Sequence, residues 1–219
     1  MTGSRDLVLG RIRAALGDVP ASESPADHPV PRDYLPAHVP ETQDALLDLL
    51  AENLADYRAR VHRTTAGRLP VLLAELLADR GSRTLAVPAD LPEAWLGALG
   101  DGIERVTDSA ALTAARLDTV DSTLTGCALA VAETGTVVLD AGPAQGRRLL
   151  TLVPDHHICV IRADQVVASV PRALPRLDPH RPQTWISGPS ATSDIELDRV
   201  EGVHGPRTLE TVLVTAEDH

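Results

Sequence analysis

From residue 69 onward, short apolar segments with strand character alternate with short helical segments, and this order restricts the fold more than any other feature of the sequence. The patterns predict helices at 69–80, 91–99, 109–115 and 165–174, strands at 83–88, 103–106, 158–161, 184–187 and 209–215, and a β-rich stretch at 125–140. This alternation is typical of α/β proteins in which helical crossovers join parallel strands. We therefore expect an open, mostly parallel sheet flanked by helices.

The first 40 residues differ from the rest in composition. Residues 4–17 place Val8, Ile12 and Leu16 at helical spacing, which predicts a short amphipathic helix with Ser4 as its cap. Residues 18–40 are rich in proline, alanine and aspartate, a composition that favours an extended tether. We predict an N-terminal helix (1–17), a Pro-rich linker (18–40) and an α/β domain (41–219) that opens with a long helix over 41–63.

Charge excludes two classes of partner. The chain has 20 basic and 31 acidic residues, a net charge of −11, so electrostatics oppose binding to nucleic acid and to anionic membranes. Its apolar runs are interrupted well before the ~20 residues that a membrane-spanning helix needs, and we find no secretory signal. A cytoplasmic protein is expected.

The sequence also predicts that this chain carries no redox cofactor or metal. It has two cysteines, Cys127 and Cys159, whereas an iron–sulfur cluster usually takes four thiolates. Every basic residue is arginine, which excludes a Schiff-base lysine and a P-loop lysine, and no G-x-G-x-x-G fingerprint is present. His156 and His157 lack metal-ligand spacing, so we interpret them as loop residues ahead of a strand.

The segment 126–142, GCALAVAETGTVVLDAG, is the first candidate for chemistry. Alternation puts three alanines on one face, a face so small that another element must approach it closely. Glu133 then lies at a strand end, where a carboxylate in a cleft can act as a general base or nucleophile. The alternative is a hairpin turn at Thr134 and Gly135 with Glu133 as its solvated flank.

The segment 186–196, ISGPSATSDIE, is the second candidate. Ser193 and Glu196 fit a capping box, which predicts a helix starting at Asp194 directly after a Ser- and Gly-rich loop. A strand, a loop and a helix N-terminus together present backbone N–H groups to an anion, and hydroxyl groups would come from Ser187, Ser190 and Thr192. The carboxylate of Asp194 would repel an anion or take its place as the negative charge at the helix start. The alternative interpretation is a self-capped connection that binds no ligand.

Two further groups have both a functional and a structural interpretation. His204 lies between glycines, where an imidazole can reach a ligand and exchange protons or can simply be fixed in a turn. Arg147 and Arg148 follow a glycine-rich turn and could hold a carboxylate or phosphate, or could be solvated.

In this order, AETGTVVLDAG, the arginine pair, SGPSATSDIE and GVHGP resemble the lactate-utilisation protein C family, which is built around the LUD domain. The resemblance implies a fold similar to the CoA-transferase and sugar-phosphate isomerase class, and a role in bacterial oxidation of L-lactate to pyruvate beside an iron–sulfur partner subunit. The matching motif residues are Glu133, Thr134, Gly135, Thr136, Ser187, Gly188, Pro189, Ser190, Thr192, Asp194, Glu196, Gly202, His204, Gly205 and Pro206. Ala191 departs from the pattern, since the family usually has a basic residue there.

Three functions remain open at this point. The first is a non-redox accessory subunit of a lactate-oxidising assembly that binds a small carboxylate or phosphate. The second is a CoA-transferase-like or isomerase-like enzyme with Glu133 and His204 as catalytic residues. The third is an adaptor whose N-terminal helix binds another chain. The oligomeric state stays open in all three, a homo-oligomer included.

Overall fold

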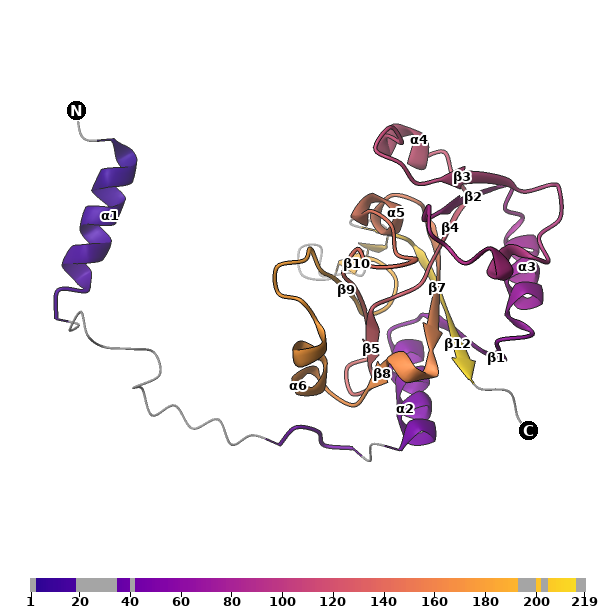
Figure 1. The fold of residues 1–219 in the computed structure, drawn as a ribbon, viewed down its shortest axis with the longest axis horizontal. Coiled ribbons are helices and arrows are strands. Elements are labelled where there is room, and N and C mark those ends of the chain that lie inside the picture. The colour runs from indigo at the N-terminus through magenta and orange to yellow at the C-terminus, as the bar shows by residue number, and fades with distance from the viewer. Residues whose placement is uncertain (1–2, 19–34, 40–41, 193–199, 202–204, 216–219) are drawn as a thin grey trace. The chain divides into compact units, whose positions relative to one another are not determined.

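The structure is a computed structural model of the chain and describes residues 3–18, 35–39, 42–192, 200–201 and 205–215 (Figure 1). The chain divides into two compact units, Met1–Leu35 and Pro36–His219. In the first unit the predicted amphipathic helix is α1 (Ser4–Ala15), which is capped by Gly3 rather than by Ser4 and has no buried residue. Within the described ranges, no helix is long and apolar enough to cross a membrane.

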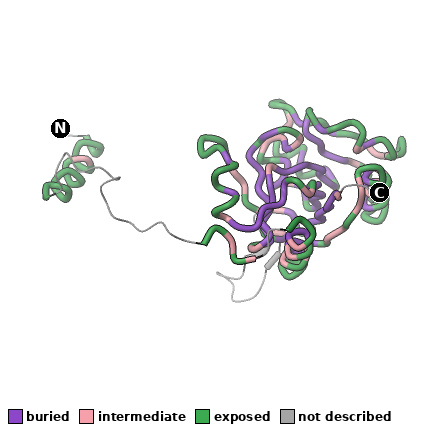
Figure 2. Tube along the Cα trace, turned by 60° about the horizontal axis from the view of Figure 1, so that its bottom comes forward, coloured by how far each residue is buried: buried purple, intermediate pink, exposed green. Residues whose placement is uncertain are grey.

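The second unit is built on a six-stranded sheet in which every pair of neighbours runs parallel. Its order is β1 (Arg60–Thr65), β12 (Thr208–Thr215), β7 (His156–Arg162), β4 (Ser122–Thr125), β2 (Thr84–Val87) and β3 (Glu104–Thr107). The central strands are buried on both faces, as expected when a parallel sheet is covered on both sides (Figure 2). The predicted α/β fold with an open parallel sheet is confirmed.

Helix α3 (Leu69–Arg80) covers one face of this sheet, where Leu73 and Leu77 share a core with Leu124 and Val160. Its bounds are those predicted from the sequence. Proline in the first turn favours the helix start, and Gly81, with a φ of 70°, provides the left-handed residue that ends it.

The other face is covered by helix α2 (Gln43–Asp56) and by a second, four-stranded sheet, which the sequence did not predict as a separate element. The order of that sheet is β8 (Val166–Val167), β5 (Leu129–Val131), β6 (Thr136–Leu139) and β9 (Thr184–Ile186). Strands β5 and β6 pair antiparallel around Thr134 and Gly135, so the interpretation of these two residues as a hairpin turn is confirmed.

Helix α2 is the element that approaches the small alanine face. Ala130 and Ala132 share a core with the buried leucines of α2, and Asn53 Nδ2 donates to Ala132 O at 2.8 Å. A Cβ atom on Gly135 would lie only 2.8 Å from the Asn53 carbonyl carbon. The predicted close approach is therefore confirmed.

The remaining described helices and strands of the second unit are short. They are η2 (Glu93–Leu96), α4 (Ala114–Leu117), α5 (Arg148–Leu152), η3 (Ala163–Gln165), α6 (Val170–Ala173), η4 (Leu174–Arg176), β10 (Ala191–Thr192) and β11 (Val200–Glu201). The helices expected at 91–99 and 109–115 are thus reduced to single turns.

Other predictions of local structure were also wrong. The helix expected over 41–63 ends at Asp56, because Arg58 takes a left-handed φ of 68° without a glycine to signal it, and β1 follows. The helix expected over 165–174 is replaced by β8 and the single turn α6. His156 and His157 are not loop residues but the first two residues of β7, where both are completely buried.

Candidate functional site

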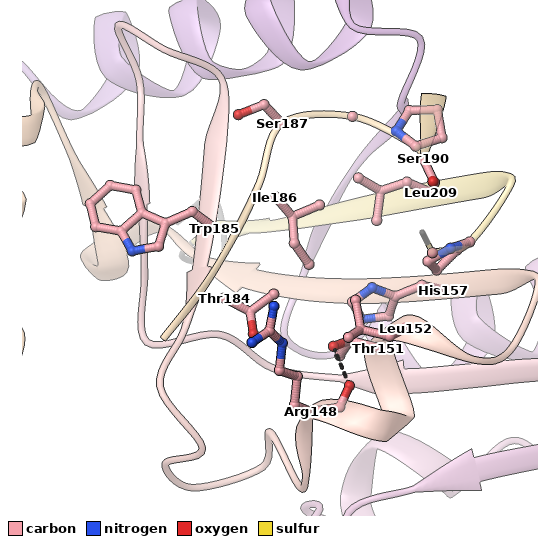
Figure 3. Close-up of a pocket in the computed structure, with 14 residues that line it drawn as sticks. Arg148, Thr151, Leu152, His157, Thr184, Trp185, Ile186, Ser187, Ser190 and Leu209 are labelled. Atoms are coloured by element: carbon pink, nitrogen blue, oxygen red, sulfur yellow. Dashed lines mark hydrogen bonds between the residues drawn. The ribbon is translucent and has the colours of Figure 1, made fainter. Parts of the chain in front are cut away.

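A cavity of about 320 Å³ lies between the two sheets at the start of β7 and β12, and we call it the serine-loop cavity (Figure 3). One wall is β9 with the loop 187–190, and the opposite wall is His157 and Leu209. Helix α5 contributes Arg148 and Thr151, whose hydroxyl donates to the Arg148 carbonyl at 3.1 Å.

Two of the motif segments singled out in the sequence meet here. Ser187, Gly188, Ser190 and Gly205 all line the serine-loop cavity. The Ser190 N–H donates to the carbonyl of Pro206 at 2.8 Å, which joins the SGPS segment to the GVHGP segment across 15 residues that separate them in sequence. The fold therefore brings together predicted ligand-binding residues from both segments, while their ligand remains a prediction.

The AETGT segment is divided between two places. Thr136 Oγ1 shares hydrogen bonds of 2.8 Å with Thr134 Oγ1 and with Ser187 Oγ, so a chain of hydroxyl groups runs from the hairpin turn to the cavity wall. The Glu133 carboxylate accepts a 2.6 Å hydrogen bond from the His38 N–H and lines a different cavity, together with Asn53 and Thr134. The structure does not bring Glu133 into the serine-loop cavity.

The two neighbouring arginines have different surroundings. Arg147, predicted to bind the ligand, is paired with the buried carboxylate of Asp108 at 2.7 Å and does not line the serine-loop cavity. Arg148 does line it, and within the described part of the chain its guanidinium has no hydrogen bond and no ion pair. Among the described residues, the cation at this cavity is therefore Arg148, which sequence reasoning considered only as half of a pair.

His157 is a cavity residue that sequence reasoning missed. Its ring is completely buried, Nε2 shares a 2.8 Å hydrogen bond with Thr125 Oγ1, and Nδ1 has no hydrogen-bond partner among the described residues. Burial, and next the charge of His156, lower its pKa from 6.5 to about 3, so the ring is neutral at physiological pH. Among the described residues that line the cavity, His157 is therefore a neutral imidazole and Arg148 is the one cation.

His156 belongs to a different group on the opposite face of the sheet. Its Nδ1 shares a 2.7 Å hydrogen bond with Ser122 Oγ, and its Nε2 lies 3.4 Å from Glu210 Oε1 without the geometry of a hydrogen bond. Burial raises the pKa of Glu210, but the rings of His156 and His62 outweigh it and bring the pKa down to about 2. The residue types are those of a Ser-His-carboxylate triad. Ser122 and His156 are completely buried, however, and no substrate can reach the hydroxyl, so we interpret this group as a structural network.

The cysteines and acidic residues do not form a metal site in the described ranges, where no three metal-ligating side chains cluster. Cys127 and Cys159 are both buried. Hydrogen bonding with Cys159 and burial raise the pKa of the Cys127 thiol, which keeps it protonated and a poor ligand or nucleophile.

Some predicted site residues lie outside the described residues. These are His204 and Asp194, together with the predicted capping box and helix start at 193–196. Ala191 and Thr192 form strand β10, which pairs antiparallel with β11, where the sequence suggested a loop.

The fold and this cavity define an α/β protein with a small polar cavity between two sheets. Residues 47–214 match the LUD domain. The chain is 42% identical to lactate utilization protein C of Deinococcus radiodurans, over 92% of this chain and 91% of that protein, and 28% identical to the protein of the same name from Geobacillus thermodenitrificans, over 97% and 96%. Among solved structures, a DUF162 family protein from Deinococcus radiodurans has 36% identity and a TM-score of 0.66, covering 80% of this chain and 99% of that one. The chain belongs to the LUD domain family.

Proposed function

We propose that the protein is a component of a bacterial lactate-utilisation system and that the serine-loop cavity binds a small carboxylate, L-lactate or its product pyruvate. Two relatives that match more than nine-tenths of the chain are named lactate utilization protein C, which supports the pathway.

The observation that carries the proposed ligand is Arg148, which lines the serine-loop cavity and has no carboxylate partner among the described residues. A guanidinium binds a carboxylate through two parallel N–H groups. Ser187 and Ser190 line the same cavity, and the Ser187 hydroxyl shares its hydrogen bond with Thr136 Oγ1. The cavity volume of about 320 Å³ is at the lower end of the range for ligand sites, as expected for a small substrate.

We propose further that the chain does not carry out the oxidation itself. Oxidation of lactate to pyruvate releases two electrons, and the only two cysteines of the sequence are both buried, whereas an iron–sulfur cluster usually takes four thiolates. An iron–sulfur partner subunit would accept the electrons. Glu133 as a catalytic carboxylate has less support, because its carboxylate is bonded to the His38 N–H outside the serine-loop cavity.

The Arg148→Gln substitution tests this function in cells. Glutamine keeps part of the packing but lacks the charge, so this variant should bind the carboxylate about tenfold more weakly, the factor expected for one charge-assisted hydrogen bond. A strain carrying it should grow more slowly than the wild type on L-lactate and normally on glucose. Arg116→Gln is the matched control, because Arg116 is an exposed arginine in α4 that pairs with Glu104 of β3 and does not line the serine-loop cavity.

A tagged wild-type strain and a deletion strain test the proposed iron–sulfur partner. The tagged wild-type protein is expected to co-purify with an iron–sulfur protein from cells grown on lactate. Normal growth on L-lactate after deletion of the gene, together with no iron–sulfur protein in the purified fraction, would contradict the proposed function.

A further inference from the structure

A second cavity, of about 460 Å³, lies where the parallel sheet reverses its direction of winding, and we call it the switch-point cavity. Strands β2 and β4 are neighbours. From β2 the chain continues to β3 on one side, whereas after β4 the next strand of this sheet is β7 on the other side. The cavity is lined by Asp90 and Trp95, which follow β2, and by Gly126 and Cys127, which follow β4. In open α/β sheets this crevice, at the carboxyl ends of diverging strands, is the usual place for a ligand.

The hydrogen-bond donors that line the switch-point cavity indicate a negatively charged ligand. Gln145 lines the cavity and is only 2% exposed; its Oε1 accepts the Asp140 N–H at 2.6 Å, while its Nε2 has no partner among the described residues. Arg176 also lines the cavity, and its single described bond is a 3.3 Å contact with the Asp164 carbonyl, without a carboxylate partner. An amide N–H and an unpaired guanidinium at one cavity favour an anion.

Arg181 adds a second guanidinium whose position is fixed. Its NH1 pairs with Asp140 Oδ2 at 3.0 Å, and its NH2 donates to the Ala141 carbonyl at 3.1 Å. Arg181 and Arg176 both line the cavity, so two guanidinium groups with unused N–H donors flank it. A phosphate can use both, since it offers more acceptor oxygens than a carboxylate does.

The loop that carries Gln145 is strained and held against both strand ends. Ala141 and Ala144 have φ values of 56° and 59°, a left-handed conformation that is unfavourable for residues other than glycine. The Ala144 carbonyl accepts the Gly126 N–H at 2.7 Å, and the Ala144 N–H donates to Asp90 Oδ2 at 3.0 Å. Strain of this kind persists where surrounding contacts impose it, and it is concentrated at functional sites.

We propose that the switch-point cavity is a second ligand site, separate from the serine-loop cavity, and that it binds an organic phosphate with a planar ring, the chemistry of a nucleotide. Arg176, Arg181 and the Gln145 amide hold the phosphate, and the ring lies against Trp95. The two cavities share no lining residue, so this site does not depend on lactate binding.

The two tryptophans of the chain allow the cavities to be tested separately, because Trp95 lines the switch-point cavity and Trp185 lines the serine-loop cavity. In the Trp185→Phe variant, Trp95 is the only tryptophan, and ADP is titrated while its fluorescence is recorded. We expect a saturable change in emission. Adding Arg176→Gln should weaken ADP about tenfold, whereas adding Arg116→Gln should leave the affinity unchanged.

Inorganic pyrophosphate, which has the phosphates but no ring, should bind more weakly than ADP. Arg176 is exposed, so an unchanged thermal midpoint will show that its replacement leaves the fold intact. The proposal is overturned if Trp95 gives no saturable response to ADP, if Arg176→Gln leaves the affinity for ADP unchanged, or if pyrophosphate binds as tightly as ADP.

Discussion

Replacing Gly188 by alanine is expected to lower the free energy of unfolding by on the order of 3 kcal/mol, because two unfavourable terms add at this position. The φ of Gly188 is 80°, a left-handed conformation that costs alanine roughly 1–2 kcal/mol. In addition, a Cβ atom there would overlap the carbonyl oxygen of Tyr57 and lie 2.7 Å from the Tyr57 Cβ. Backbone atoms at the end of α2 cannot move aside as a flexible side chain can.

Gly81→Ala is the matched control for this prediction. Gly81 has a similar φ of 70°, but nothing lies within 4 Å of the position a Cβ would take. It should therefore show only the conformational cost, roughly 1–2 kcal/mol. Urea unfolding of both variants measures the difference between their free energies of unfolding. Equal destabilisation would show that the close approach of the serine loop to Tyr57 adds no cost to the Gly188→Ala substitution.

The second large effect is a loss of stability in mild acid that depends on His157. The pKa of His157 is about 3 in the folded protein, whereas a histidine in the unfolded chain has the ordinary pKa of 6.5. The unfolded chain therefore binds a proton first as the pH falls. The contribution of neutral His157 to the free energy of unfolding is fully present above pH 6.5 and decreases as the pH falls from 6.5 toward 3. At pH 5 the His157 contribution should be about 2 kcal/mol less favourable than at pH 8.

Urea unfolding of the wild type and of His157→Gln at both pH values checks this. Glutamine can keep a hydrogen bond with Thr125 but does not titrate, so its stability should fall less between pH 8 and pH 5. Glu210 does not interfere, because its pKa moves from 4.5 to about 2 and its contribution is lost only at lower pH. His180→Gln, at an exposed histidine, should behave like the wild type, and the same loss in His157→Gln would contradict the assignment.

Local sequence patterns predicted the elements that depend on neighbouring residues, such as single helices, but not those that depend on pairing between distant segments. The helix from Leu69 to Arg80 was predicted with its bounds from the spacing of its apolar residues, and in the structure Pro70 and Gly81 favour its two ends. The end of α2 was missed because Arg58 adopts a left-handed conformation that its sequence does not announce. The second sheet was missed because it depends on distant pairing, such as Val137 with Ile186, which no local period encodes.

The candidate site was predicted in part for the same reason. The motifs identified Ser187, Gly188, Ser190 and Gly205, and these residues line one cavity. They could not show that Glu133 turns toward His38, or that Arg148 rather than Arg147 lines the serine-loop cavity. The position of His157 in this cavity depends on how β7 packs in the folded chain, which is a tertiary property.

Titration of L-lactate into the Trp95→Phe variant tests the central claim most directly, because Trp185, in the serine-loop cavity, is then the only tryptophan. With sodium chloride as the control for ionic strength, we predict a saturable change in Trp185 emission, and about tenfold weaker binding when Arg148→Gln is added. No saturable response of Trp185, or an affinity that Arg148→Gln leaves unchanged, would contradict lactate binding in this cavity.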